Sequence, residues 1–102
     1  MKMAYDGRLR EDRGYEIEVR LWVRPGEDAG FQDYESRTFA IMARHGARVL
    51  DVTRPGLASG PHEIHRLRFP SQEAFSAYRD DPALIALSDM RARVVQKTEF
   101  SV

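Results

Sequence analysis

The chain has no cysteine among its 102 residues. That absence excludes disulfide bonds, thiolate metal sites and cysteine nucleophiles together. Neither sign of charge is in excess, since 16 basic side chains balance 16 acidic ones, whereas nucleic-acid-binding domains usually carry a basic surplus. No apolar run approaches the ~20 residues of a membrane span. We therefore expect a cytoplasmic protein that binds neither nucleic acid nor membrane.

Length and composition predict one domain. The content of 42% hydrophobic and 31% charged residues is typical of a soluble globular domain, and a chain this short forms a single core. Residues 1–13 are charged and lack the apolar middle of a signal peptide. We expect a flexible N-terminal lead-in over residues 1–13 and one domain over residues 15–102.

The clearest regular pattern is the alternation of side chains from Tyr15 to Arg24. The odd-numbered positions are apolar, whereas the even-numbered ones are charged or hold Trp22. Because successive side chains of a strand leave on opposite faces, this period predicts a half-buried strand. Pro25 lacks the backbone donor that the strand would need to continue.

Apolar residues at three- and four-residue steps predict two helices. The first runs over about residues 28–45, and Gly46 is a natural stop after it. The second begins after Ser71, and a shorter helical piece over about residues 82–89 follows it. The other strands are predicted over residues 47–54, 63–69 and 92–100.

The predicted order is strand, helix, strand, strand, helix, strand. Two Phe-x-x-Tyr pairs lie in matching places, each after a strand-like run that ends in proline. They are Phe31 with Tyr34 and Phe75 with Tyr78. One antiparallel four-stranded sheet with two main helices on one face satisfies this order, which predicts a ferredoxin-like α+β fold.

In this topology the first and third strands lie side by side, and one of their faces is left without a covering element. A large aromatic side chain on such a face usually marks a contact. We therefore expect a homodimer through this face, with Ile64 and Leu50 joining Trp22 there; the alternative is a solvated face with one exposed tryptophan. The expected contact residues are Glu18, Arg20, Trp22, Arg66 and Arg68.

Two segments carry a resemblance to a known family. They are residues 69–75, Phe-Pro-Ser-Gln-Glu-Ala-Phe, with Tyr78 and Asp81-Pro82 behind them, and residues 44–48, Arg-His-Gly-Ala-Arg. They resemble the dimeric α+β barrel superfamily, and within it most the uncharacterised domain-of-unknown-function family thirteen-thirty, over about residues 15–100. The resemblance implies a homodimer whose two sheets close into a barrel.

The relatives implied by this resemblance include cofactor-free monooxygenases, haem-degrading enzymes, small isomerases and proteins without assigned activity. The first two groups commonly use an asparagine near the reactive centre. Asparagine is absent from this chain, which disfavours both chemistries. No glycine-rich phosphate loop is present either, and we expect neither a cofactor nor a metal ion.

Histidines are the first candidates for chemistry, because they titrate near neutral pH. Alternation puts His65 on the helix-facing side of its strand. There it is either a hydrogen-bonded core histidine or, if it borders a cavity with Tyr34 or Tyr78, a general base. His45 ends the first helix, as a dipole-stabilised terminal residue or as an acid or base at a pocket rim. The candidate catalytic residues are His65, His45 and Tyr34.

Three further patterns carry less weight. Asp51 could pair with His65 if their strands are neighbours in a suitable register. His62 and His65 have a spacing that could suit a metal, but positions three apart in a strand point to opposite faces. Four arginines could hold an anion, although glutamates on the same face favour mutual neutralisation. These arginines are Arg20, Arg24, Arg66 and Arg68.

The sequence leaves three functions open. The first is a small homodimeric barrel of unassigned activity that binds a small organic ligand between helices and sheet. The second is a cofactor-independent enzyme, monooxygenase-like or isomerase-like, with a histidine and tyrosine pocket. The third is a non-catalytic assembly module. A solvent-reachable cavity lined by His65 and tyrosines favours the enzyme, whereas a filled core favours the other two.

Overall fold

The structure is a computed structural model that describes residues 14–102; the lead-in predicted over residues 1–13 lies outside the described residues. The elements are β1 (Tyr15–Val23), α2 (Asp28–Arg44), β2 (Arg48–Thr53), β3 (Glu63–Phe69), α3 (Gln72–Arg79), α4 (Pro82–Ile85), α5 (Ser88–Val94) and β4 (Val95–Ser101).

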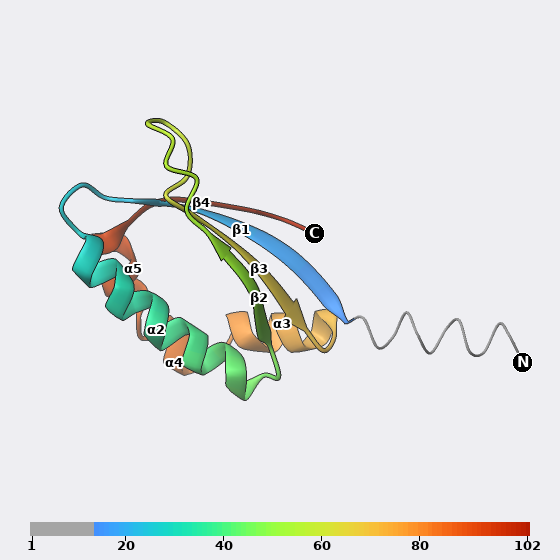
Figure 1. Cartoon of the computed structure of the whole chain (residues 1–102). Coiled ribbons are helices and arrows are strands. Elements are labelled where there is room, and N and C mark those ends of the chain that lie inside the picture. Colours follow the sequence, from blue (N-terminus) through green and yellow to red (C-terminus); the bar gives the residue numbers. More distant parts are fainter. Residues whose placement is uncertain (1–13) are drawn as a thin grey trace, which may run out of the picture.

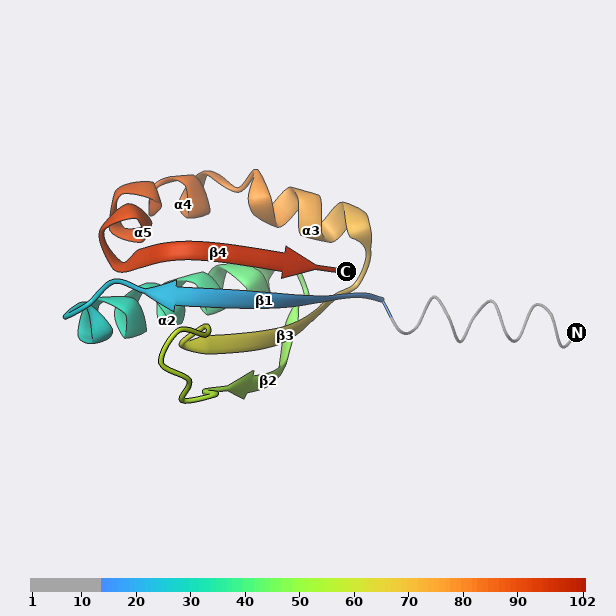
Figure 2. The same cartoon turned by 90° about the horizontal axis from the view of Figure 1, so that it is seen from above.

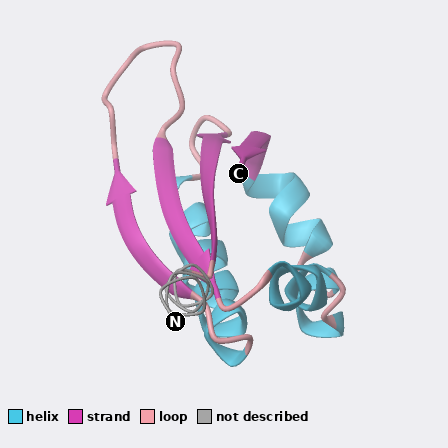
Figure 3. Cartoon of the chain, turned by 90° about the vertical axis from the view of Figure 1, so that its right-hand side faces the viewer, coloured by secondary structure: helices cyan, strands magenta, loops and turns pink. Residues whose placement is uncertain are grey.

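The strands form one antiparallel sheet in the order β2-β3-β1-β4. Figure 1 shows the helices on one side of this curved sheet. Seen from above, α2 lies under the sheet, and α3, α4 and α5 follow its β4 side (Figure 2). The end-on view in Figure 3 shows the same separation of α2 from the later helices. This arrangement confirms the predicted ferredoxin-like α+β fold, with β1 and β3 at its centre.

The core lies between the sheet and the helices in two clusters of buried side chains. One contains Ile17, Ile41, Met42, Leu67, Phe69 and Tyr78. The other contains Leu21, Val23, Phe31, Tyr34, Val94 and Val95. The two tyrosines of the Phe-x-x-Tyr pairs therefore lie in different clusters, one in each half of the core.

The start of the last strand differs from the prediction. Residues 92–94, expected to begin the strand, belong to α5, and the helical piece expected over residues 82–89 is two helices, α4 and α5. Val94 and Val95 are both buried, at 0% and 5% exposed. Alternation within a strand would expose one of two successive side chains, whereas a helix that passes directly into a strand buries both.

The sheet face away from the helices is here called the outer face. Strands β1 and β3 contribute Glu18, Arg20, Trp22, Ile64, Arg66 and Arg68 to it. Leu50, expected to join Trp22, lies instead where the β2–β3 register shifts, on an edge strand two positions from β1.

Charged side chains on the outer face largely neutralise one another. Arg68 Nη2 lies 2.8 Å from Glu16 Oε2, and Arg20 Nη1 lies 2.6 Å from Glu18 Oε2. This pairing agrees with the expected mutual neutralisation and leaves little net charge for an anionic ligand on this face.

Trp22 is half-buried. Lys97 Nζ stands 4.6 Å from the centre of its ring, and its indole N–H donates to the Ser59 carbonyl at 3.5 Å. Part of the tryptophan is therefore covered by its own chain.

In the described part of the chain, no helix is both long and apolar enough to cross a membrane.

Candidate functional site

A cavity of about 420 Å³ lies between the sheet and the helices. The cavity is lined by residues of β1, β3 and β4 and by residues of each helix in residues 14–102. The lining is mainly apolar, as in most small-molecule sites, and its volume falls within their range of ~300–1,000 Å³. Its ionisable side chains are Tyr34, Glu35, His65, Tyr78, Arg79 and Arg91.

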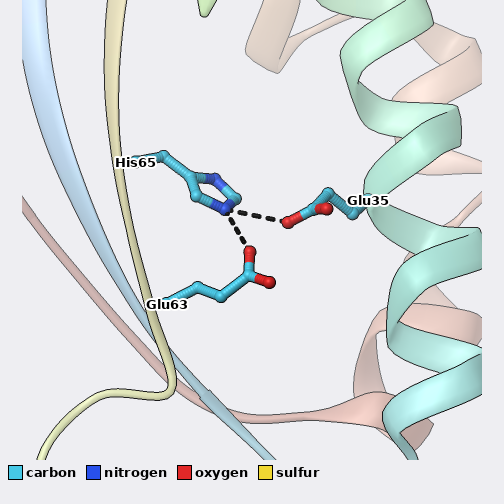
Figure 4. Close-up of side chains that lie close together, drawn as sticks. All are labelled: Glu35, Glu63 and His65. Carbon is cyan, nitrogen blue, oxygen red and sulfur yellow. Dashed lines mark hydrogen bonds and ion pairs between the residues drawn. The ribbon is translucent and has the colours of Figure 1, made fainter. Parts of the chain in front are cut away.

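His65 lies on the helix-facing side of β3, as predicted, and is 4% exposed. Its Nε2 atom is 2.7 Å from Glu63 Oε1 and 2.9 Å from Glu35 Oε2. Figure 4 shows the two carboxyl groups converging on this one nitrogen, from β3 and from α2. The histidine is therefore held by carboxyl groups, at the wall of a cavity that Tyr34 and Tyr78 also line.

Glu63 is the charged member of this group. It lies two residues before His65 on the same strand and so shares its face. Arg54 donates to Glu63 Oε2 at 2.9 Å. Burial alone would raise the pKa of Glu63, but hydrogen bonds from Glu35 and His65 and the charge of Arg54 hold it below its usual value.

Glu35 is the protonated member. Burial raises the pKa of Glu35 to about 8, and the hydrogen bond to Glu63 and its negative charge add to the effect. At neutral pH Glu35 therefore keeps its proton and donates it to the Glu63 carboxylate. Its buried Oε2 atom accepts no well-aligned hydrogen bond within residues 14–102. This oxygen lies 2.9 Å from the Nε2 atom of His65.

Replacing Glu35 by glutamine is expected to alter how stability depends on pH. The ordinary pKa of glutamate is 4.5 and that of folded Glu35 is about 8. Between these values the folded chain holds a proton that the unfolded chain has lost, so wild-type stability falls as pH rises and levels off above 8. Glutamine does not titrate. The melting temperature of the variant minus that of wild type should therefore be about 5–10 °C larger at pH 9 than at pH 5. Parallel thermal melts measure this, and a constant difference would contradict the titration assigned to Glu35.

The two cavity tyrosines are suited to donating hydrogen bonds and not to acting as bases. Burial raises the pKa of Tyr34, with the Arg91 charge and hydrogen bond acting against it. Burial also raises the pKa of Tyr78, far above its ordinary value. Both phenols therefore remain protonated at neutral pH. Tyr34 shares the cavity with His65, as the sequence proposed.

His45, the other candidate, does not line the cavity. Its Nε2 atom lies 2.8 Å from Asp81 Oδ2. The hydrogen bond from His45 lowers the pKa of Asp81, which also caps α4 through the Ala83 N–H. His45 thus ties the end of α2 to the start of α4, and the structure does not bring it together with His65.

Asp51 is not paired with His65. Strands β2 and β3 are neighbours, but Asp51 is opposite Arg66 and Val52 is opposite His65. Alternation therefore turns Asp51 to the outer face. His62 is exposed, as expected, and its Nδ1 accepts the Val23 N–H at 3.1 Å.

Sequence reasoning missed Glu35 and Glu63, although two signals were present. Glu63 has the same parity as His65 in its strand. Glu35 lies four residues after Phe31 and three before Thr38, on the stripe that faces the core. Both signals fall on glutamates, a residue type that is usually solvated.

The same three side chains have the chemistry of a cation site. Glu35, Glu63 and His65 each offer one ligand atom, and these atoms lie within 4.8 Å of one another. Carboxylate and imidazole donors suit divalent zinc or manganese. A cation there would have to displace the proton of Glu35 and lie near the Arg54 charge.

Comparison with known proteins supports the fold. No protein-family model and no curated protein matches the chain. A protein of unknown function from Rhodopseudomonas palustris matches with a TM-score of 0.69 and 17% identity, over 99% of this chain and 90% of that one. A dabb family protein with a ferredoxin-like fold from Mesorhizobium loti matches with a TM-score of 0.65 and 17% identity, over 84% and 90%.

A candidate antibiotic biosynthesis monooxygenase from Nitrosomonas europaea matches with a TM-score of 0.68 and 13% identity, over 88% of each chain. At such identities the likeness concerns the fold. The fold is ferredoxin-like, as the sequence predicted, and the resemblance to the dimeric α+β barrel superfamily stays a prediction. The narrower resemblance to family thirteen-thirty stays a prediction, and the Rhodopseudomonas palustris protein is itself of unknown function.

Proposed function

We propose that the protein binds a small, mainly apolar organic molecule in the cavity and moves a proton to or from it at Glu35. The observation that carries this proposal is a carboxyl group with a pKa of about 8 on the wall of that cavity. A group whose pKa lies near the working pH is the most effective general acid or base.

His65 and Glu63 support Glu35 in this role. When Glu35 gives up its proton, a second carboxylate appears beside Glu63. The Nε2 atom of His65 lies 2.7 Å from Glu63 Oε1 and 2.9 Å from Glu35 Oε2, so its one N–H can be shared between the two carboxylates, while the charge of Arg54 acts on Glu63. Proton removal from carbon in this way is the chemistry of a cofactor-independent isomerase. It is also the first step of cofactor-free oxygenation, so the Nitrosomonas likeness is compatible with it.

Ring opening of 5-nitrobenzisoxazole tests the proposal, because it needs only an apolar site and a base. The base removes the proton on carbon, those electrons form the nitrile, and the nitrogen–oxygen bond breaks to give a coloured phenolate. We expect catalysis by the wild-type chain to rise with pH through about 8 and then level off, as Glu35 ionises. Absorbance follows the rate.

His45→Gln is the control variant, since His45 does not line the cavity, and its rate should equal that of wild type. A chelator should leave the rate unchanged, because the step uses only side chains of the chain. No rate above that of free acetate would refute the proposal. Loss of rate with chelator would assign the chemistry to a cation at Glu35, Glu63 and His65.

We also propose that two copies pair through the outer face, in agreement with the implied barrel. Support comes from a sheet face that the helices leave uncovered. Trp22 and Ile64 lie on that face among ion pairs that are already neutral. A domain of this size gains considerable stability from a partner. A location in the cytoplasm stays a prediction from the cysteine-free composition.

A further inference from the structure

The charged groups of the cavity are separated across the width of the sheet. On the helix-facing side, His65 is opposite Val19 in β1, and Val19 is opposite Phe100 in β4. The next row runs from Glu63 over Leu21 to Thr98. The carboxyl–imidazole group therefore marks the β3 end of both rows.

Two arginines mark the β4 end. The guanidinium of Arg79 lies 5.6 Å from the centre of the Phe100 ring. Arg91 Nη2 donates to Thr98 Oγ1 at 2.7 Å. Two strand spacings separate β3 from β4, which is about 10 Å. This separation between the arginines and His65 is similar to the length of a two-ring aromatic molecule.

These arginines differ from most of the other arginines in residues 14–102. Arg20, Arg54, Arg66 and Arg68 each pair with a glutamate. Arg79 and Arg91 have no carboxylate within 4.0 Å in residues 14–102. Both are exposed and line the cavity. A guanidinium offers five N–H donors in a plane that matches a carboxylate.

The wall between the two ends is aromatic as well as apolar. Phe31, Phe75 and Phe100 line the cavity together with the two tyrosines. Aromatic walls favour a planar aromatic ligand.

At the β3 end the charged Glu63 would repel an anion, so an anionic ligand has one favourable orientation in this cavity.

We infer that the ligand is an aromatic carboxylate. Its carboxylate is bound by Arg79 and Arg91 at the β4 end, and its ring extends over β1 towards Glu35 and His65. This inference rests on the proposed function, because it names the class of molecule that the same cavity receives. The arginines fix one end of the ligand and so determine which carbon meets Glu35.

Two probes of the same shape test this, 2-naphthoate and the neutral 2-naphthalenemethanol. We expect titration calorimetry of the whole chain to give about 10-fold tighter binding for naphthoate, with a preference that falls as salt is added. The double variant Arg79→Gln, Arg91→Gln should lose this preference and keep its affinity for the alcohol. Arg93→Gln is the matched control, since Arg93 is exposed on α5 and does not line the cavity.

The outcomes separate the two proposals. Equal binding of both probes by wild type, or an unchanged preference in the double variant, overturns the arginine anchor and leaves the cavity proposal standing. Binding of neither probe overturns both. If the double variant does not fold, the wild-type comparison and Arg79→Gln alone still decide.

Discussion

Glu35→Gln should slow the ring opening of 5-nitrobenzisoxazole about 10²-fold at about pH 9. Glutamine has the shape of a protonated glutamate, and its amide N–H can still donate to the Glu63 carboxylate. It cannot accept a proton from carbon. The substitution therefore removes the proposed base and preserves the surrounding hydrogen bonds.

The Glu35→Gln substitution should lower kcat and leave KM nearly unchanged, because the apolar walls that bind the probe are intact. His65→Gln provides a second readout. It should shift the midpoint of the pH–rate profile, since the imidazole stabilises ionised Glu35, while a purely packing role would leave the midpoint in place. A Glu35→Gln chain as active as wild type would exclude Glu35 as the base.

The second large effect concerns assembly. Trp22→Glu is expected to weaken the proposed homodimer about 10²-fold in dissociation constant, because a buried aromatic anchor is replaced by a charge. The new carboxylate would stand near Lys97, which lies 4.6 Å from the Trp22 ring in wild type. The folded monomer should therefore persist. Sedimentation velocity over a dilution series measures the constant.

Gln72→Glu is the matched control for charge. Gln72 is exposed on α3, on the helix side of the sheet, so the same added charge should leave the dissociation constant unchanged. A Trp22→Glu chain that dimerises as tightly as wild type would show that the outer face is not the interface, and a monomeric wild type would remove the dimer altogether.

Much of the fold follows from the sequence, because simple periods determine it. The alternation from Tyr15 and the helical stripe through Phe31 each bury one face, which sets the layers, and the order of strands and helices along the chain predicts the sheet topology. The same alternation correctly turned His65 towards the helices. It failed at Val94, where a helix enters the strand directly and both neighbours are buried.

The candidate site was only half predictable. His65 and Tyr34 carry their own chemical signal, so they were found. Glu35 and Glu63 belong to a residue type that is usually solvated, and what makes them unusual is their mutual approach, which depends on how α2 crosses β3. His45 was proposed from its residue type and its position at the end of the first helix, and its contact with Asp81 is set by the α3–α4 junction.

The turn over residues 54–62 touches both sides of the sheet. At its base Arg54 donates to Glu63 beside the cavity, and further along the Ser59 carbonyl accepts the indole N–H of Trp22 on the outer face. A displacement of this turn would separate Glu63 from its counterion and raise the proton affinity of the paired carboxyl groups. One turn thus supplies both a counterion for the buried carboxyl pair and a hydrogen-bond partner for the outer-face tryptophan.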